Sequence, residues 1–310
     1  MSDVPAIRAI DLTKFYGRRR GVEGVTFAVQ PGEVVGFLGP NGSGKTTVLR
    51  MLMGLISITR GTAELFGRSV ADADPSVRRD IGYLPGTLGV YDKMTAREYF
   101  RFLARIRGRD CTASFESLSE RLSLDPSLHI GSMSKGTKQK VGVIQAFMHS
   151  PRLLILDEPT SGLDPLIQHE FDDLLAETRE QGTAVLLSSH ILSEVERLAS
   201  RVAILNNGTL IVFDDVEALP GHETHSIVLE FASPVDSSRF AHVSGFTMTS
   251  CDENRLEGTM TGSQRPLLET ALQEDLVAVQ SPEPSLDELF RQLVDDSTRA
   301  NHRQSAPVMK

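Results

Sequence analysis

One nine-residue segment constrains the fold of this chain more than any other: residues 39 to 47 read Gly-Pro-Asn-Gly-Ser-Gly-Lys-Thr-Thr. The segment before it, residues 33 to 38, is apolar after Glu33 and predicts a short buried strand, and residues 45 to 56 are good helix formers. This strand–loop–helix setting turns the N–H groups of a glycine-rich loop and a helix N-terminus towards a phosphate chain. The segment therefore predicts a binding site for a nucleoside triphosphate.

Each residue type in this loop has a chemical task. Glycines permit the backbone conformations that turn N–H groups towards a phosphate. The ammonium group of Lys45 neutralises the β and γ phosphates, and the hydroxyl of Thr46 is placed to bind Mg²⁺. A glycine-rich turn with an incidental lysine is the alternative, which the flanking strand and helix disfavour. The nucleotide-binding residues expected in the loop are Gly39, Pro40, Asn41, Gly42, Ser43, Gly44, Lys45, Thr46 and Thr47.

A second apolar run ends in two carboxylates. Residues 153 to 156 are apolar and lead into Asp157, a pattern typical of a buried parallel strand. Proteins with α/β folds place their ligand sites at the carboxyl ends of such strands. Asp157 is therefore expected to bind Mg²⁺ together with Thr46, and Glu158 to orient the attacking water. A core strand that merely ends in two acids is the alternative, and the phosphate loop makes it remote.

A third segment, residues 133 to 141, reads Met-Ser-Lys-Gly-Thr-Lys-Gln-Lys-Val. Here the chain resembles the ATP-binding cassette (ABC) family, whose signature loop has the pattern Leu-Ser-Gly-Gly-Gln before a helix. Two positions match that pattern and three are variants: Ser134 and Gly136 match, and Met133, Lys135 and Thr137 differ. Taken alone, the segment would be the lysine-rich start of a solvated helix. Its order and distance from Lys45 and Glu158 favour the resemblance instead.

The resemblance implies that the signature binds the γ phosphate held by an opposing cassette. The residues concerned are Ser134, Lys135, Gly136 and Thr137. Because the chain carries one signature and one phosphate loop, we expect a second cassette subunit, either a homodimer partner or a related chain. ATP would then bridge the two halves, and its cleavage would let them part.

Three further features extend the resemblance over residues 1–220. His190 follows the predicted strand 183–189 and is similar to the family's switch histidine, which senses the γ phosphate. Tyr16 is similar to its adenine-stacking aromatic, although it could equally be a core residue. The segment after the catalytic acid is similar to its D-loop and comprises Ser161, Gly162, Leu163 and Asp164. The resemblance implies an ATPase that uses ATP and Mg²⁺, with Lys45, Glu158 and His190 as its catalytic residues.

One position departs from the family pattern. The family usually places a glutamine after the strand near residue 85, in contact with Mg²⁺, water and the membrane partner, and this chain has Gly86 there. Glycine offers no side-chain ligand, so water or another group must complete the coordination of the metal. We therefore expect hydrolysis that is slower or less tightly linked to the partner.

Alternating strands and helices predict an α/β fold: a P-loop ATPase core with antiparallel β and inserted helical subdomains, plus a small α+β C-terminal domain. The cassette is expected over residues 1–220, with its helical insertion at about 87–150. An accessory domain is expected at 221–296, ending in a helix at 284–293, and a disordered tail at 297–310. Within the insertion, Ala96, Tyr99, Phe100, Leu103 and Ile106 repeat at helical spacing and are expected to face the core.

The composition of the chain limits the kinds of partner that we expect it to have. No apolar stretch approaches the ~18 residues needed to cross a bilayer, and the N-terminus lacks a signal-peptide pattern, so transport is expected to need a separate permease. Cys111 and Cys251 form no metal or redox motif and suit a reducing cytoplasm. Residues 221–310 hold 7 basic and 14 acidic side chains, which argues against a nucleic-acid partner.

The resemblance points to the ATPase subunit of a bacterial exporter at the cytoplasmic face of the membrane, moving a drug, antibiotic or lipid-like substrate. Residues 91–107 are the candidate contact with the permease. An importer ATPase is the nearer alternative, although it would more often retain the loop glutamine. A soluble cassette ATPase acting on ribosomes or nucleic acid is the other, which the single cassette and the acidic charge disfavour.

Overall fold

The computed structural model describes residues 4–72, 75–89, 91–219 and 224–281. Within it the chain divides into two compact units, and the boundary in the sequence falls between Asp215 and Val216. The predicted domain limits at 220 and 296 stay predictions. The expected helix at 284–293 and the expected tail at 297–310 lie outside the described residues. None of the helices in the described ranges has the length and apolar character needed to cross a bilayer.

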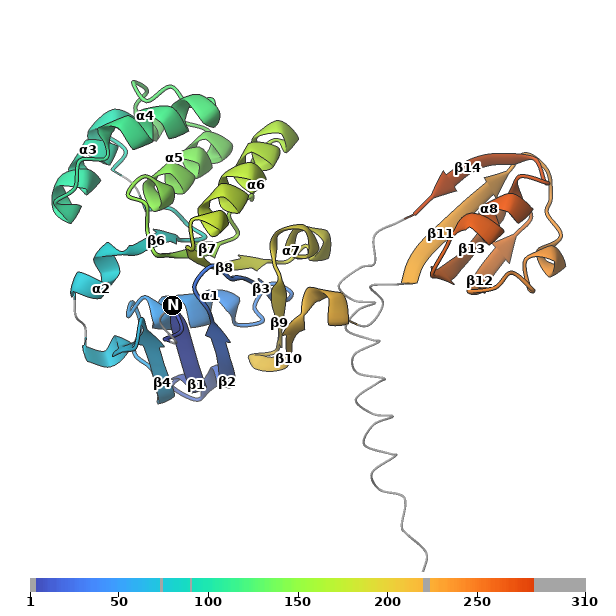
Figure 1. Ribbon diagram of the computed structural model, residues 1–310, viewed down its shortest axis with the longest axis horizontal. Coiled ribbons are helices and arrows are strands. Elements are labelled where there is room, and N and C mark those ends of the chain that lie inside the picture. Colours follow the sequence, from blue (N-terminus) through green and yellow to red (C-terminus); the bar gives the residue numbers. More distant parts are fainter. Residues whose placement is uncertain (1–3, 73–74, 90, 220–223, 282–310) are drawn as a thin grey trace, which may run out of the picture. The chain divides into compact units, whose positions relative to one another are not determined.

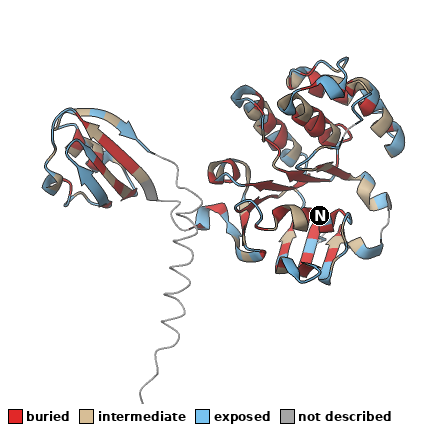
Figure 2. Cartoon of the chain, turned by 180° about the vertical axis from the view of Figure 1, so that it is seen from behind, coloured by how far each residue is buried: buried red, intermediate tan, exposed pale blue. Residues whose placement is uncertain are grey.

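A six-stranded sheet forms the centre of the first unit, in the order β10-β9-β3-β8-β7-β6. All its neighbours run parallel except β9 and β10, which form a hairpin. The strands are β3 (Val34–Leu38), β6 (Ile81–Leu84), β7 (Leu153–Asp157), β8 (Ala184–Ser189), β9 (Arg201–Asn206) and β10 (Thr209–Asp215). Every residue of β3, β7 and β8 is buried, as Figure 2 shows in red, because both faces of the sheet are covered.

One face of this sheet packs against a helix and a second sheet. The second sheet is antiparallel and has the order β2-β1-β4-β5. Its strands are β1 (Ile7–Tyr16), β2 (Arg19–Val29), β4 (Arg60–Leu65) and β5 (Arg68–Ser69), and the helix is α1 (Lys45–Leu52). Side chains of both sheets and of α1 form one buried apolar cluster, which includes Phe27, Phe37 and Leu49. Helix α1 is shorter than the predicted 45–56, because Gly54 adopts a left-handed backbone with φ of +64°.

Further helices precede β6, occupy the segment between β6 and β7, and follow β7 (Figure 1). They are α2 (Pro75–Arg79), α3 (Ala96–Arg107), α4 (Thr112–Arg121), α5 (Lys135–Phe147), α6 (Pro165–Glu180) and α7 (Leu192–Leu198). Thr95 and Glu98 form a capping box at the start of α3, and Gly108 ends it with φ of +67°. The expectation that Ile106 faces the core is wrong: its side chain is 61% exposed, in the last turn of α3 beyond the buried Tyr99, Phe100 and Ala104.

The second unit contains a four-stranded antiparallel sheet in the order β12-β13-β11-β14. Its elements are β11 (Thr224–Phe231), β12 (Phe246–Asp252), β13 (Arg255–Thr261), α8 (Arg265–Ala271) and β14 (Leu276–Gln280). Leu267 and Ala271 of α8 pack with Ile227, Leu229 and Phe240 in a small core of its own. The predicted α+β character of this region is therefore confirmed.

Candidate functional site

The phosphate loop links the end of β3 to the first residue of α1. Gly42 and Gly44 have φ of +82° and +111°, in the left-handed range that residues with a Cβ rarely adopt. A Cβ on Gly44 would come within 2.4 Å of the Val22 side chain. The hydroxyl of Ser43 is buried and has no hydrogen-bond partner among the described residues, so it is an unused polar group inside the loop. The loop thus has the backbone and an unpaired donor that suit a phosphate chain.

Lys45 is the buried cation of this site. Its Nζ donates to the Gly39 carbonyl at 2.5 Å and to the Pro40 carbonyl at 3.3 Å. It also lies 3.7 Å from Oε1 of Glu158. Burial lowers the pKa of Lys45, and the carboxylates of Glu158 and Asp157 oppose that effect. A cation held by two carbonyls and one carboxylate is placed to neutralise phosphate charge at the mouth of the loop.

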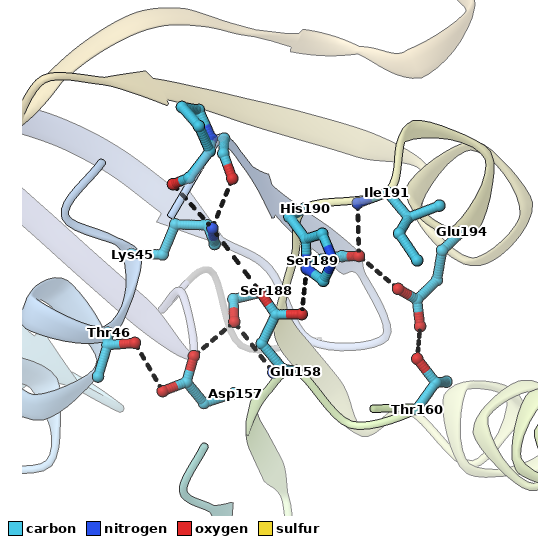
Figure 3. A network of polar contacts seen from close by, with 12 residues as sticks. Lys45, Thr46, Asp157, Glu158, Thr160, Ser188, Ser189, His190, Ile191 and Glu194 are labelled. Carbon is cyan, nitrogen blue, oxygen red and sulfur yellow. Dashed lines mark hydrogen bonds and ion pairs between the residues drawn. The ribbon is translucent and has the colours of Figure 1, made fainter. Parts of the chain in front are cut away.

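Two oxygen ligands for a hard cation lie side by side. Oγ1 of Thr46 donates to Oδ2 of Asp157 at 2.8 Å, and the hydroxyl of Ser188 donates to Oδ1 of the same carboxylate at 2.6 Å. Asp157 is 1% exposed and sits at the carboxyl end of β7 (Figure 3). A carboxylate and a hydroxyl are the donor types that Mg²⁺ takes beside nucleotide phosphates, so the residues present fit this ion. The sequence analysis missed Ser188, although two serines at the end of a buried strand, directly before His190, were a visible signal.

Glu158 follows Asp157 and has a strained backbone, with φ of +54°. Its N–H group donates to the carbonyl of Ser188 at 3.2 Å and to the hydroxyl of Ser188 at 3.1 Å. Its side chain lies between two cationic or titratable groups, because Oε2 is 2.7 Å from Nδ1 of His190 and Oε1 faces Lys45 (Figure 3). This geometry brings together the three residues expected to be catalytic, with Glu158 in the middle.

A buried carboxylate that the sequence analysis missed, Glu194, links the two segments that carry Glu158 and His190. Glu194, on α7, is 5% exposed and accepts hydrogen bonds from the hydroxyls of Thr160 and Ser189 (Figure 3). Ser189 directly precedes His190, and its hydroxyl also accepts from the N–H of Ile191 at 3.0 Å. Glu194 therefore ties the segment after Glu158 to the segment that carries His190.

Gly86 lies beside the carboxylate of Asp157, the expected Mg²⁺ ligand. A Cβ built on it would come within 2.9 Å of Oδ2 of Asp157. A side chain at this position would therefore begin next to the expected Mg²⁺ ligand, as the sequence comparison with the family's glutamine implied. With glycine there, the chain supplies no ligand from this loop position.

These residues line one pocket of about 680 Å³. Tyr16 lies on its wall with 48% of its side chain exposed, available for stacking, and remains a predicted adenine contact. The other lining residues are Arg19, Arg20, Gly21, Asn41, Gly42, Ser43, Gly44, Lys45, Thr46, Thr47, Arg50, Gly86, Thr87, Asp157, Glu158, Ser161 and His190. Gly39 and Pro40 contribute through the carbonyls that bind Lys45.

None of the described residues lining this pocket belongs to the signature. Ser134 instead caps α5, where its hydroxyl accepts from the N–H of Thr137 at 3.1 Å. Within the D-loop, Leu163 is buried and Asp164 caps α6 by accepting from the N–H of Ile167 at 3.1 Å. The single chain thus brings together the phosphate loop, Asp157, Glu158 and His190, but not the signature.

Comparison with known proteins agrees with this geometry. Residues 22–161 match the family model described as ABC transporter. The bacitracin transport ATP-binding protein BcrA of Bacillus licheniformis is 39% identical over 208 residues, which cover 66% of this chain and 68% of that protein. The protein of the same name from Enterococcus faecalis is 34% identical over 228 residues, 73% of each chain.

Solved structures show the same fold. A structure titled as the ATP-binding subunit of an ABC transporter is 34% identical, with a TM-score of 0.65, and covers 69% of this chain and 91% of that one. The dimeric bacterial ABC transporter cassette MJ0796 is 22% identical, with a TM-score of 0.63, and covers 68% and 98%. The predicted fold class and the predicted ATP hydrolysis are confirmed. This chain belongs to the ABC transporter family, as an ATP-binding subunit that hydrolyses ATP.

Proposed function

We propose that this ATPase powers export of a substrate through a separate permease, at the cytoplasmic face of the membrane. The observation that carries the proposal is a pocket that brings together the phosphate loop, Asp157, Glu158 and His190, in a chain similar to the two proteins named for bacitracin transport. The substrate class that this similarity supports is an antibiotic, a drug or a lipid-like molecule. Cargo selectivity would reside in the permease.

The pocket suggests how each side chain acts on ATP. Lys45 and the N–H groups of the loop offset charge on the β and γ phosphates, while Glu158 orients the attacking water and accepts its proton. His190 holds Glu158 through the 2.7 Å contact and, as a residue lining the same pocket, would sense the γ phosphate. Thr46 and Asp157 are the residues that would hold Mg²⁺, which when bound neutralises phosphate charge. The products are ADP and inorganic phosphate.

We further propose that two cassettes act together, as a homodimer or with a related subunit. The signature residues do not line the pocket of their own chain, which supports binding of the γ phosphate across an interface. In a homodimer the interface would be isologous and would contain two equivalent ATP sites. Closure on ATP and opening after hydrolysis would then move the attached permease. The candidate permease contact at residues 91–107 includes the exposed side chains of Tyr91 and Ile106.

A pull-down of tagged Glu158→Gln from detergent-solubilised native membranes, with Mg²⁺ and ATP, tests the proposal. Removing the water-orienting carboxylate should trap the ATP-bound closed state. Recovery of a polytopic membrane protein, identified by mass spectrometry, would support the transporter assignment. Its yield should fall, or the protein should be absent, when ADP replaces ATP. Recovery of ribosomes or nucleic acid without a membrane protein would overturn the export proposal, while the assignment as an ATPase would stand.

A further inference from the structure

One buried amide joins the signature helix to the catalytic acid within a single chain. Gln139 lies on α5 and is 9% exposed. Its Nε2 donates to the carbonyl of Glu158 at 3.0 Å and to the carbonyl of Pro159 at 2.8 Å. Because both partners are carbonyls, only the NH₂ end of the amide can face them, which fixes its orientation. Its two donors therefore bind two successive peptide groups.

This contact falls on the strained part of the active site. Glu158 has φ of +54°, and a non-glycine residue keeps such a backbone only when its surroundings hold it there. Ser188 holds the N–H side of Glu158 from β8, as described above. Gln139 holds the carbonyl side from α5. Without the second set of bonds, the peptide could relax and turn the carboxylate away from Lys45 and His190.

A second contact between the same two segments lies one turn earlier. A Cβ placed on Gly136 would come within 2.4 Å of the carbonyl oxygen of Gly162, so the signature and the D-loop pack backbone to backbone. Gln139 follows Ser134, the N-cap of α5, by five residues on the same rigid helix. A displacement of the N-terminus of α5 would therefore reach the Glu158 peptide through Gln139 and the D-loop through Gly136.

We infer that Gln139 is a positioning residue that sets the orientation of Glu158 according to the position of the signature helix. Among the described residues, the hydrogen bonds of the Gln139 side chain go to backbone carbonyls, so Gln139 acts through the backbone of Glu158 and Pro159. In the proposed dimer, on which this last step rests, the signature of one chain contacts the partner's ATP. Gln139 then makes hydrolysis in a chain depend on whether its own signature has engaged the other site.

The Gln139→Met variant tests the positioning role, because it keeps an unbranched side chain of similar length and removes both donors. We expect kcat to fall about 10- to 100-fold, as for a catalytic group misplaced by about 1 Å, with the Kd for ATP changed less than about twofold. Gln139→Lys restores N–H donors and should recover part of kcat. The matched control is Gln145→Met, on the same helix, which loses bonds to Tyr83 and Tyr99 but none to Glu158.

The residual rate of Glu158→Gln separates positioning from general damage. If Gln139 acts through Glu158, adding Gln139→Met to Glu158→Gln should change the single-turnover rate by less than about twofold. A loss by the same factor as in the wild-type background would overturn the inference. Equal losses of kcat in Gln139→Met and Gln145→Met would also overturn it.

Hydrogen exchange tests the link to the signature without relying on turnover. In Glu158→Gln, ATP should slow exchange in the segment 158–164, and Gln139→Met should remove most of that protection. Unchanged protection would refute the link. Size-exclusion chromatography of Glu158→Gln with ATP tests the dimer separately: a chain that stays monomeric refutes the two-cassette proposal, whereas the positioning role is decided by the rates above.

Discussion

The buried His149 should make the stability of the first unit depend on pH. His149 follows α5 and is 4% exposed, with Nε2 3.2 Å from the carbonyl of Ile81. Its Nδ1 has no hydrogen-bond partner among the described residues. Desolvation, reinforced by the charge of Arg107, lowers the pKa of His149 from 6.5 to about 4. The folded protein therefore keeps this imidazole neutral at pH values at which the unfolded chain protonates it.

The difference in the pKa of His149 between the folded and unfolded states sets the sign and size of the pH effect on stability. The unfolded state binds the proton near pH 6.5, so the stabilisation is complete above that value and is lost as pH falls towards the folded pKa of about 4. At ~1.36 kcal/mol for each pKa unit, the full loss is about 3.4 kcal/mol. Between pH 7.5 and pH 5.0, where only the unfolded chain becomes protonated, about 2 kcal/mol of unfolding free energy should disappear.

Comparison with His149→Gln isolates this contribution from the carboxylates, which titrate in both proteins. Urea unfolding followed by far-UV circular dichroism would give the free energy at each pH, since the chain has no tryptophan. Hydrogen exchange of peptides from β6 and β7 would assign the change to the first unit. We expect the wild type to lose about 2 kcal/mol more than the variant over this range. Equal pH dependence in the two proteins would contradict the reasoning.

Three further outcomes are expected. Tyr16→Ala should weaken ATP binding roughly tenfold, as loss of a base–aromatic stack does, whereas Tyr16→Phe should not, as titration with a fluorescent ATP analogue would show. Glu194→Ala should lower the unfolding free energy by about 2–4 kcal/mol, because two buried hydroxyls lose their acceptor, and Glu194→Gln by less than half of that in urea unfolding. Gly86→Gln should raise turnover severalfold over Gly86→Ala, which shares the crowding of Asp157; equal ATPase rates and equal permease dependence would count against the metal-ligand argument.

The sequence predicted those parts of the site that are built from contiguous residues. The phosphate loop needs a strand, a glycine-rich turn and a helix start in direct succession, and each leaves a local mark in residues 33 to 56. Asp157 and Glu158 are marked in the same way by the apolar strand before them. Parallel strands carry their carboxyl ends to one edge of the sheet, so these local predictions also indicated that Lys45 and Glu158 would meet.

Contacts between distant segments could not be predicted in this way. Gln139 stands in a lysine-rich stretch that is typical of a solvated helix face, yet in the structure it is buried and donates to the carbonyls of Glu158 and Pro159. Glu194 occupies an ordinary position of a polar helix, and it becomes buried because Thr160 and Ser189 supply its hydrogen bonds. A charged or amide side chain is buried only where hydrogen-bond partners exist. Glu158 lies 19 residues from Gln139, and Thr160 lies 34 residues from Glu194. Ser189 is nearer to Glu194 in the sequence but is separated from it by a short loop.

Gly86 is another position whose contacts could not be predicted from the sequence. Its sequence position revealed that a side chain was missing, but not what the missing side chain would have met. The structure supplies that contact, because the Cβ of any other residue would lie 2.9 Å from Oδ2 of Asp157. The carboxylate is held on its other oxygen by Ser188 and cannot retreat without breaking that 2.6 Å bond. A glutamine at position 86 would therefore add a Mg²⁺ ligand and also crowd the existing ligand, Asp157. Because Gly86→Ala crowds Asp157 without adding a ligand, the difference in ATPase rate between Gly86→Gln and Gly86→Ala measures the effect of the added ligand alone.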